Sequence, residues 1–165
     1  MKKEWRSKGL WLVALSWLLC AGCAYFEPPV FCLSFHREVN RDSFASGTEL
    51  IQPVHDVLGG NDHIVERFPI LDSSSFGSVE LVPGENGKWG LRLQMDRKGI
   101  GLWRQATGEH ARQTLVILLD GYVSGTMTIP PYDESGYVMI PPLWSEQEAR
   151  RIASHVQSNY KKTNR

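Results

Sequence analysis

The continuous apolar run from Thr114 to Leu119 is the feature that most constrains the fold. Six consecutive residues with almost no polar side chain predict a central strand that is covered on both faces. Asp120-Gly121 follows at once, and this pair favours the positive φ angles of a tight hairpin turn. The stretch Tyr122–Ile129 is therefore predicted to return antiparallel to the first strand.

A second strand is predicted from strict alternation between Trp89 and Met95. Its odd-numbered residues are apolar and its even-numbered neighbours include Arg92 and Gln94, so one face is expected to be buried. The turn residues Gly84–Gly87 precede it. Further strands are predicted at Val30–Val39, Ser78–Pro83 and Tyr137–Ile140, with a short extended piece at Phe68–Leu71 and a loop at 73–78.

Two helices are predicted, at Asp96–Gln113 and after Ser145. Asp96 is a plausible N-cap for the first, and Ser145 with Glu148 forms a capping box for the second. The secondary structure of Thr48–Glu66 is ambiguous. Its apolar residues have helical spacing, but Gly59-Gly60 stops the run. Together these elements predict an α+β fold: a ferredoxin-like antiparallel sheet with two helices packed on one face.

The N-terminal segment has the layout of a secretory signal peptide. Residues 1–8 are basic, Gly9–Leu19 is uncharged and apolar, and Cys20-Ala21-Gly22-Cys23 resembles the bacterial lipobox. Residues 1–22 are therefore expected to be a lipoprotein signal peptide and Cys23 the lipidated N-terminus. Ala24 after the cysteine favours the outer membrane, facing the periplasm, by resemblance to the usual sorting rule. The alternative is an uncleaved N-terminal membrane anchor.

The remaining chain divides into a tether at 23–29, a domain at 30–160 and a basic tail at 161–165. Without residues 1–22 it carries 14 basic and 17 acidic residues, a net charge near −3. Nucleic-acid binders need a basic footprint, so no nucleic-acid partner is expected. Cys32 lies in an apolar, strand-like run and is expected to be a small buried hydrophobe.

Several segments of the chain form a recognisable series: Leu115–Val123 and Trp144–Ala153, the strand and helix containing Leu91–Met95, Trp103, Thr107 and Ala111, and Phe35-His36-Arg37-Glu38 as a first strand. By these segments the C-terminal two-thirds resembles the periplasmic head subdomain of the SecD family of protein-export subunits. The resemblance covers roughly Val79–Ser158 and implies the fold of that subdomain. An export function does not follow, because family members couple export to the proton gradient through spanning helices that are not evident after the leader.

The sequence has few residue patterns that are typical of catalytic or metal-binding sites. No nucleophile elbow or dinucleotide fingerprint is present, so the protein is expected to be non-enzymatic and without a cofactor or metal. The alternative is a metal-dependent or hydrolytic factor, because four residues on either side of Gly59-Gly60 are possible ligands: His55, Asp56, Asp62 and His63.

Aromatic residues beside rigid prolines favour a binding surface. Tyr132, Tyr137 and Trp144 are the candidate binding rim, next to Pro130-Pro131 and Pro141-Pro142. The sequence thus predicts a lipid-anchored envelope protein that binds a protein or polypeptide partner through an edge strand or the 130–142 loop. A structural envelope spacer is a further alternative.

We expect Cys23→Ala to abolish incorporation of labelled palmitate, because the acyl chains are attached at that sulfur. Cys32→Ala is the matched control and should label like the wild type. Mass spectrometry that finds an intact Met1 terminus, or label retained in Cys23→Ala, would contradict the anchor.

Overall fold

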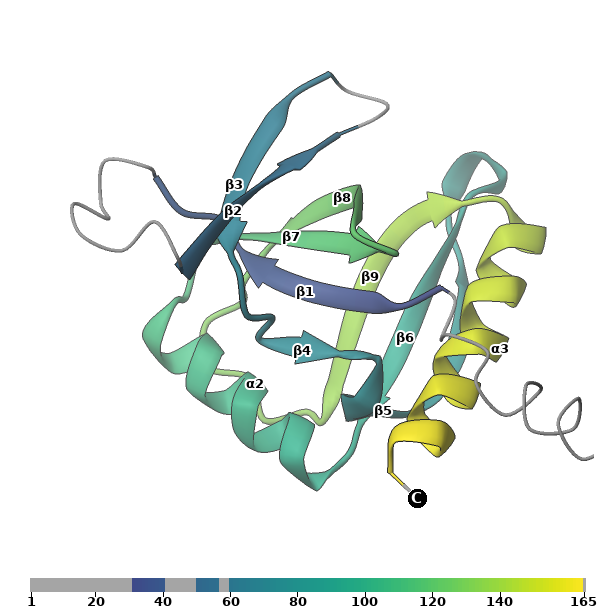
Figure 1. The fold of residues 1–165 in the computed structure, drawn as a ribbon. Helices are drawn as coiled ribbons and strands as arrows, with labels where there is room; N and C mark the ends of the chain where they lie inside the picture. The colour runs from purple at the N-terminus through teal and green to yellow at the C-terminus, as the bar shows by residue number, and fades with distance from the viewer. Residues whose placement is uncertain (1–30, 41–49, 57–59, 165) are drawn as a thin grey trace, which may run out of the picture.

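The computed structural model describes residues 31–40, 50–56 and 60–164 (Figure 1). Cys23 and the segments expected to be a signal peptide and a tether lie outside the described residues. Within them the strands form three antiparallel sheets with the orders β4-β1-β7-β8, β2-β3 and β5-β6-β9. The tail expected at 161–165 is largely helical, since the last helix continues to Thr163.

The four-stranded sheet is built around β7 (Thr114–Leu119), as the apolar run predicts. One neighbour is β1 (Leu33–Arg37), which also pairs with the two-residue strand β4 (Leu71–Asp72). The other is β8 (Tyr122–Thr128), reached through Asp120-Gly121. Both turn residues have positive φ, 52° and 85°, which confirms the predicted hairpin.

The three-stranded sheet contains the alternating strand β6 (Trp89–Met95), with the predicted bounds. β5 (Phe76–Pro83) and β9 (Tyr137–Trp144) pair with its two edges. Both are longer than predicted: β5 takes in part of the expected serine loop, and β9 continues through Pro141-Pro142. Proline is tolerated there because β9 ends its sheet and needs no ladder bond on its outer side.

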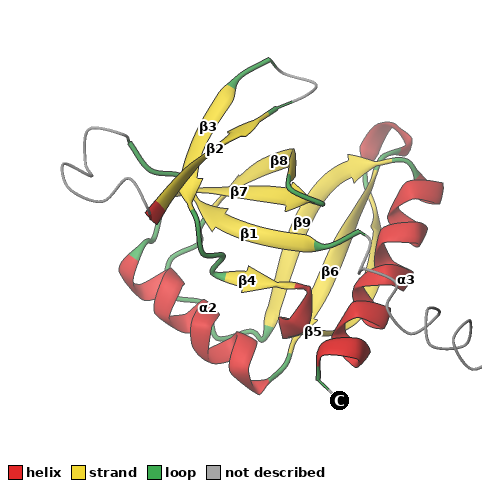
Figure 2. Cartoon of the chain, viewed as in Figure 1, coloured by secondary structure: helices red, strands yellow, loops and turns green. Residues whose placement is uncertain are grey.

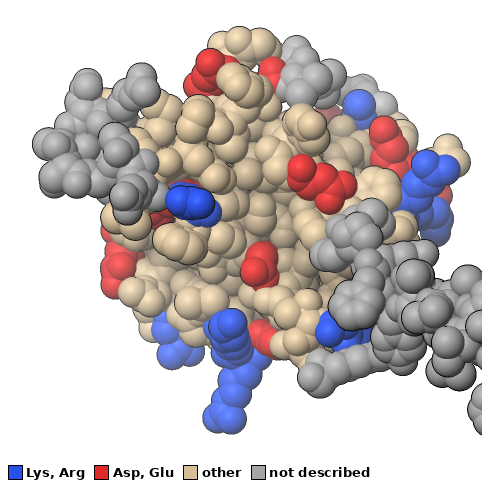
Figure 3. Space-filling model, viewed as in Figure 1, with Lys and Arg blue, Asp and Glu red and all other residues tan. Residues whose placement is uncertain are grey.

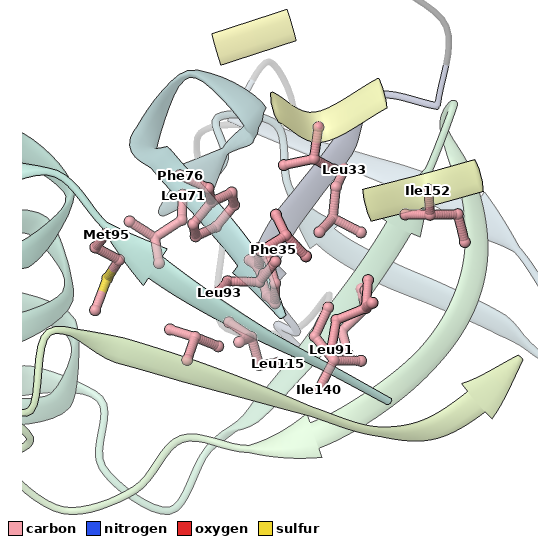
Figure 4. Close-up of a cluster of buried hydrophobic side chains, with 14 of the residues drawn as sticks. Leu33, Phe35, Leu71, Phe76, Leu91, Leu93, Met95, Leu115, Ile140 and Ile152 are labelled. Atoms are coloured by element: carbon pink, nitrogen blue, oxygen red, sulfur yellow. The ribbon is translucent and has the colours of Figure 1, made fainter. Parts of the chain in front are cut away.

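The main core lies between these two sheets (Figure 4). Phe35 and Leu115 reach it from the four-stranded sheet, and Leu91, Leu93 and Ile140 reach it from the three-stranded sheet; all five are buried. The Phe35 and Phe76 rings meet edge to face with centroids 5.5 Å apart. Burial of side chains from both sheets against each other holds the sheets together.

Two helices complete this core (Figure 2). α2 (Arg97–Glu109) begins at the predicted N-cap Asp96, whose Oδ1 accepts from the Gly99 N–H at 2.7 Å, and it packs beside β4 and β6. α3 (Glu146–Thr163) begins at the predicted capping box and packs along β5. Ala149, Ile152 and Val156 form its buried stripe.

The described residues of the stretch Thr48–Glu66 do not form the helix that its apolar spacing allows. The described part of this stretch is a hairpin of β2 (Ile51–His55) and β3 (Asp62–Glu66). It covers the outer face of the four-stranded sheet, where Val54 and Val65 pack on residues of β7 and β8 in a second, smaller core. Because β7 is apolar on both faces, its outer side chains need this cover. The local pattern of residues 48–66 cannot show that this stretch provides it.

The α+β class, with antiparallel strands and two helices, is confirmed. Where one sheet was expected, the described residues give three, because no strand ladder joins the hairpin, or the strands on the far side of the core, to the β4-β1-β7-β8 sheet.

A buried histidine fastens the hairpin to β1. His36 is 4% exposed; its Nδ1 donates to the Glu66 carbonyl at 2.7 Å and its Nε2 accepts from the Ser34 hydroxyl at 3.0 Å. Arg37 forms an ion pair with the Glu66 carboxylate beside it. Burial lowers the pKa of His36, although the carbonyl and the charge of Glu66 pull it the other way. The imidazole is therefore held neutral.

We expect the contribution of His36 to the free energy of unfolding to be constant above about pH 7 and to fall as the pH drops through about 6.5, the ordinary histidine value. In that window the unfolded chain binds a proton that folded His36 resists. The measurement is urea unfolding between pH 5 and 7 of the wild type and His36→Gln, in which the slope due to His36 should be absent. Identical slopes in the two proteins would contradict it.

Candidate functional site

The four possible metal ligands near the hairpin tip do not converge. His55 and Asp62 face each other across the β2–β3 ladder and form a hydrogen bond of 2.5 Å between Nδ1 and Oδ1. His63, next along β3, points to the opposite face and bonds Glu38 at 2.7 Å. Asp56 lies beyond the end of β2, where its backbone N–H bonds the Asn61 carbonyl. Among the described residues, no group of three or more possible ligands is close enough to hold a metal ion. The prediction that these side chains could form one site is therefore wrong, because strand alternation separates them.

The candidate rim residues lie at the two ends of β9. Tyr137 begins the strand and Trp144 ends it, so about 20 Å separates them at the usual strand rise. Tyr132 precedes the strand; it is 63% exposed, and its hydroxyl donates to Glu134 at 2.7 Å. Tyr132 and Tyr137 therefore belong to one region, and Trp144, packed against the main core, belongs to another.

Beside Tyr137, a hollow of about 280 Å³ opens between β8 and β9. Most of its wall is apolar. It is lined by Trp103 from α2, by Met127 and Thr128 from β8, and by Tyr137, Val138 and Met139 from β9. We call this region the β8–β9 seam. It lies where the last strand of one sheet passes the last strand of the other.

The seam is closed at its other end by Gly125 and Leu143. A Cβ on Gly125 would lie 2.8 Å from Leu143 Cδ1, so the Leu143 side chain packs directly against the backbone of β8 at this glycine. The hollow lies farther along both strands, beside Met127 and Met139. The seam thus has a closed end at Gly125 and an open end near Tyr137.

The loop at the open end is held in place by α2. The Trp103 indole N–H donates to Asp133 Oδ2 at 3.0 Å, and the Thr107 hydroxyl accepts from the Asp133 N–H at 3.1 Å. Burial alone would raise the pKa of Asp133, but hydrogen bonds from Trp103 and Ser135 outweigh it and lower the pKa. Asp133, which also lines the hollow, is therefore a fixed negative charge at neutral pH.

The described chain begins at Phe31 and Cys32, which form hydrogen bonds with Asp120. The Asp120 carboxylate accepts from the Phe31 and Cys32 N–H groups at 3.1 and 2.8 Å, and its own N–H donates to the Cys32 carbonyl at 2.9 Å. Burial raises the pKa of the half-buried Cys32 thiol, and the charges of Asp120 and Asp72 add to the effect. The thiol is thereby kept protonated, although it is half-buried and not buried as expected.

Sequence reasoning reached the 130–142 region through its tyrosines and prolines, but it missed Met127 and Met139 of the seam. Met139 is 48% exposed although its neighbours Val138 and Ile140 are buried. Pro141-Pro142 is the signal that could have found it, because prolines within a strand indicate a sheet edge.

On the face shown in Figure 3, basic side chains are scattered among acidic and uncharged ones. Neither described helix is long and apolar enough to cross a bilayer.

Comparison with curated protein sequences gave no match. Two solved structures share the fold. One is of a membrane component SecDF that enhances protein export, with a TM-score of 0.59 and 19% identity over 79% of this chain and 63% of that chain. The other is of SecDF in a super-membrane-facing form, with a TM-score of 0.56 and 20% identity over 77% of this chain and 18% of that chain. This protein therefore spans less than two thirds of either.

The two solved structures match in fold, whereas the match to a family model rests on the amino-acid sequence. Residues 49–159 match the SecDF P1 head subdomain, and this range begins just before β2 and ends near the end of α3. It covers well over half of the chain and includes both strands of the seam. The protein belongs to the SecDF P1 head subdomain family.

Proposed function

We propose that this protein is a lipid-anchored, non-catalytic envelope module that binds polypeptide segments on the export route. The observation that carries the proposal is the β8–β9 seam: two strand edges and an apolar hollow, within the part of the chain that matches the head subdomain. Strand edges and apolar hollows are features that recognise extended polypeptide rather than a small substrate.

The family supports the export context. The structure with the higher TM-score is of a membrane component that enhances protein export, and its fold is shared over 79% of this chain. The four possible ligands near the hairpin tip do not converge: His55 bonds Asp62, while His63 bonds Glu38 on the opposite face. This removes the geometric basis of the metal-dependent alternative.

The anchor would act by raising local concentration. Seven residues separate Cys23 from Phe31, and an extended chain of that length reaches roughly 22 Å. Two acyl chains on Cys23 hold far more firmly than one, at about 0.8 kcal/mol for each buried methylene. A weak binding surface held this close to a bilayer meets its partner at a high effective concentration. Placement at the outer membrane, favoured by Ala24, is part of the same proposal.

The test is site-specific photo-crosslinking of the full chain to a radiolabelled exported precursor stalled during translocation. We expect an adduct with the crosslinker at Tyr132, since it stands beside the open end of the seam. Tyr122 is the matched control: it is also a tyrosine and also 63% exposed, but it lies at the start of β8. Cys23→Ala should weaken the adduct. If Tyr132, Tyr122, Phe68 and Leu102, which are all exposed, each give no adduct, the proposed function is wrong.

A further inference from the structure

We infer that the β8–β9 seam is a strand acceptor: an extended apolar segment of a partner polypeptide pairs its backbone with the outer edge of β9 and places side chains in the hollow. The inference rests on the proposed function and names the site and the conformation of the bound segment.

The outer edge of β9 faces the hollow. Tyr137, Val138 and Met139 all line it although they are consecutive. Side chains of a strand alternate between faces, so three consecutive residues can line one space only along the edge of the strand. β9 is the last strand of its sheet, with β6 on its other side. An incoming strand at this edge would extend that sheet.

The backbone of Met139 offers the pairing groups. At Tyr137 the N–H donates to the Ser135 hydroxyl and the carbonyl accepts from it, both at 3.2 Å, so these two groups point away from β6. Backbone groups in an antiparallel strand alternate in direction, and the β6–β9 register is regular from Tyr137 to Ile140. The N–H and carbonyl of Met139 therefore also point outward, where no hydrogen bond joins them to another described residue.

The hollow suits side chains of varied shape. Met127 and Met139 stand on its two sides, and Trp103 lines it from α2. Methionine is unbranched and polarizable, so a methionine-lined surface can fit different apolar residues. Such a wall favours a partner chosen for being extended and apolar rather than for one sequence.

The two ends of the seam set the length and polarity of the segment. Pro141 and Pro142 have no N–H to offer, and Ser135 occupies the outward groups of Tyr137. Pairing is therefore centred on Met139, within Tyr137–Ile140, a stretch of about 13 Å. At the open end, Asp133 is a fixed negative charge in the lining of the hollow. The segment that fits best is therefore short, apolar and flanked by a lysine or arginine.

Methionine methyl NMR tests this with controls that the chain itself provides. The chain has four methionines, of which Met127 and Met139 line the hollow and Met95 is buried in the main core. The full chain, labelled with ¹³C at the methionine methyl groups and placed in lipid nanodiscs, is titrated with a synthetic peptide of two lysines followed by alternating valine and threonine. We expect the Met127 and Met139 signals to shift with peptide concentration and the Met95 signal to stay in place.

Two controls distinguish strand pairing from non-specific hydrophobic binding. The same peptide with alternate backbone nitrogens methylated should bind at least about tenfold more weakly, because it lacks the N–H groups that pair with β9. Met139→Lys should weaken binding of the unmodified peptide by a similar factor, with Met127 as the reporter. Leu102→Lys places the same substitution at an exposed position on α2 and should leave binding unchanged.

The outcomes distinguish this inference from the proposed function. Unmoved Met127 and Met139 signals, or equal binding of the N-methylated peptide, would overturn the strand acceptor. If the precursor still crosslinked to another exposed position, the proposed function would stand with a different site. If neither experiment showed binding, both would be wrong.

Discussion

Burial of β7 on both of its faces is the constraint on which the rest of the fold depends. Leu115 and Ile117 enter the main core, while Val116 and Leu118 enter the smaller core under the β2–β3 hairpin. Each such side chain contributes about 1.5–3 kcal/mol when it is fully buried. A strand of this kind cannot lie in an outer layer, so the molecule needs material on both sides of the four-stranded sheet. The second sheet and the helices provide one side, and the hairpin provides the other.

The same arrangement leaves the β8–β9 seam open. Two sheets that share a core do not have to share an edge, and here β8 and β9 approach at Gly125 and Leu143 without forming a ladder. Proteins usually protect such edges, because unpaired strands invite pairing with other chains. In β9 the prolines and the Ser135 hydroxyl protect the two ends of the strand, and the stretch around Met139 is left between them.

The parts of the fold that could be predicted from the sequence are those with a local physical signal. The alternation of Trp89–Met95, the apolar run of β7, the Asp120-Gly121 turn and the caps at Asp96 and Ser145 all specify their element within a few residues, and the structure confirms them.

The hairpin and the seam were harder to predict because their causes are not local. Ile51 and Val54 suit a helix as well as a strand, and only the uncovered face of β7 and β8 decides between them. Of the candidate rim, Tyr137 lines the hollow, and the binding role of Tyr132, Tyr137 and Trp144 stays a prediction. The contribution of Met127 depends on which strands end their sheets, and that appears only in three dimensions.

The clamp at Asp120 has a mechanical consequence. Three hydrogen bonds tie the incoming chain at Phe31 and Cys32 to the turn between β7 and β8. If Cys23 is held in a bilayer, any pull on the body of the protein reaches the fold through this point. Because β1 lies between β4 and β7, a load that reaches β1 is shared by the ladders on both of its sides. The clamp would then not bear a load on the tether alone, since the four-stranded sheet lies directly behind it.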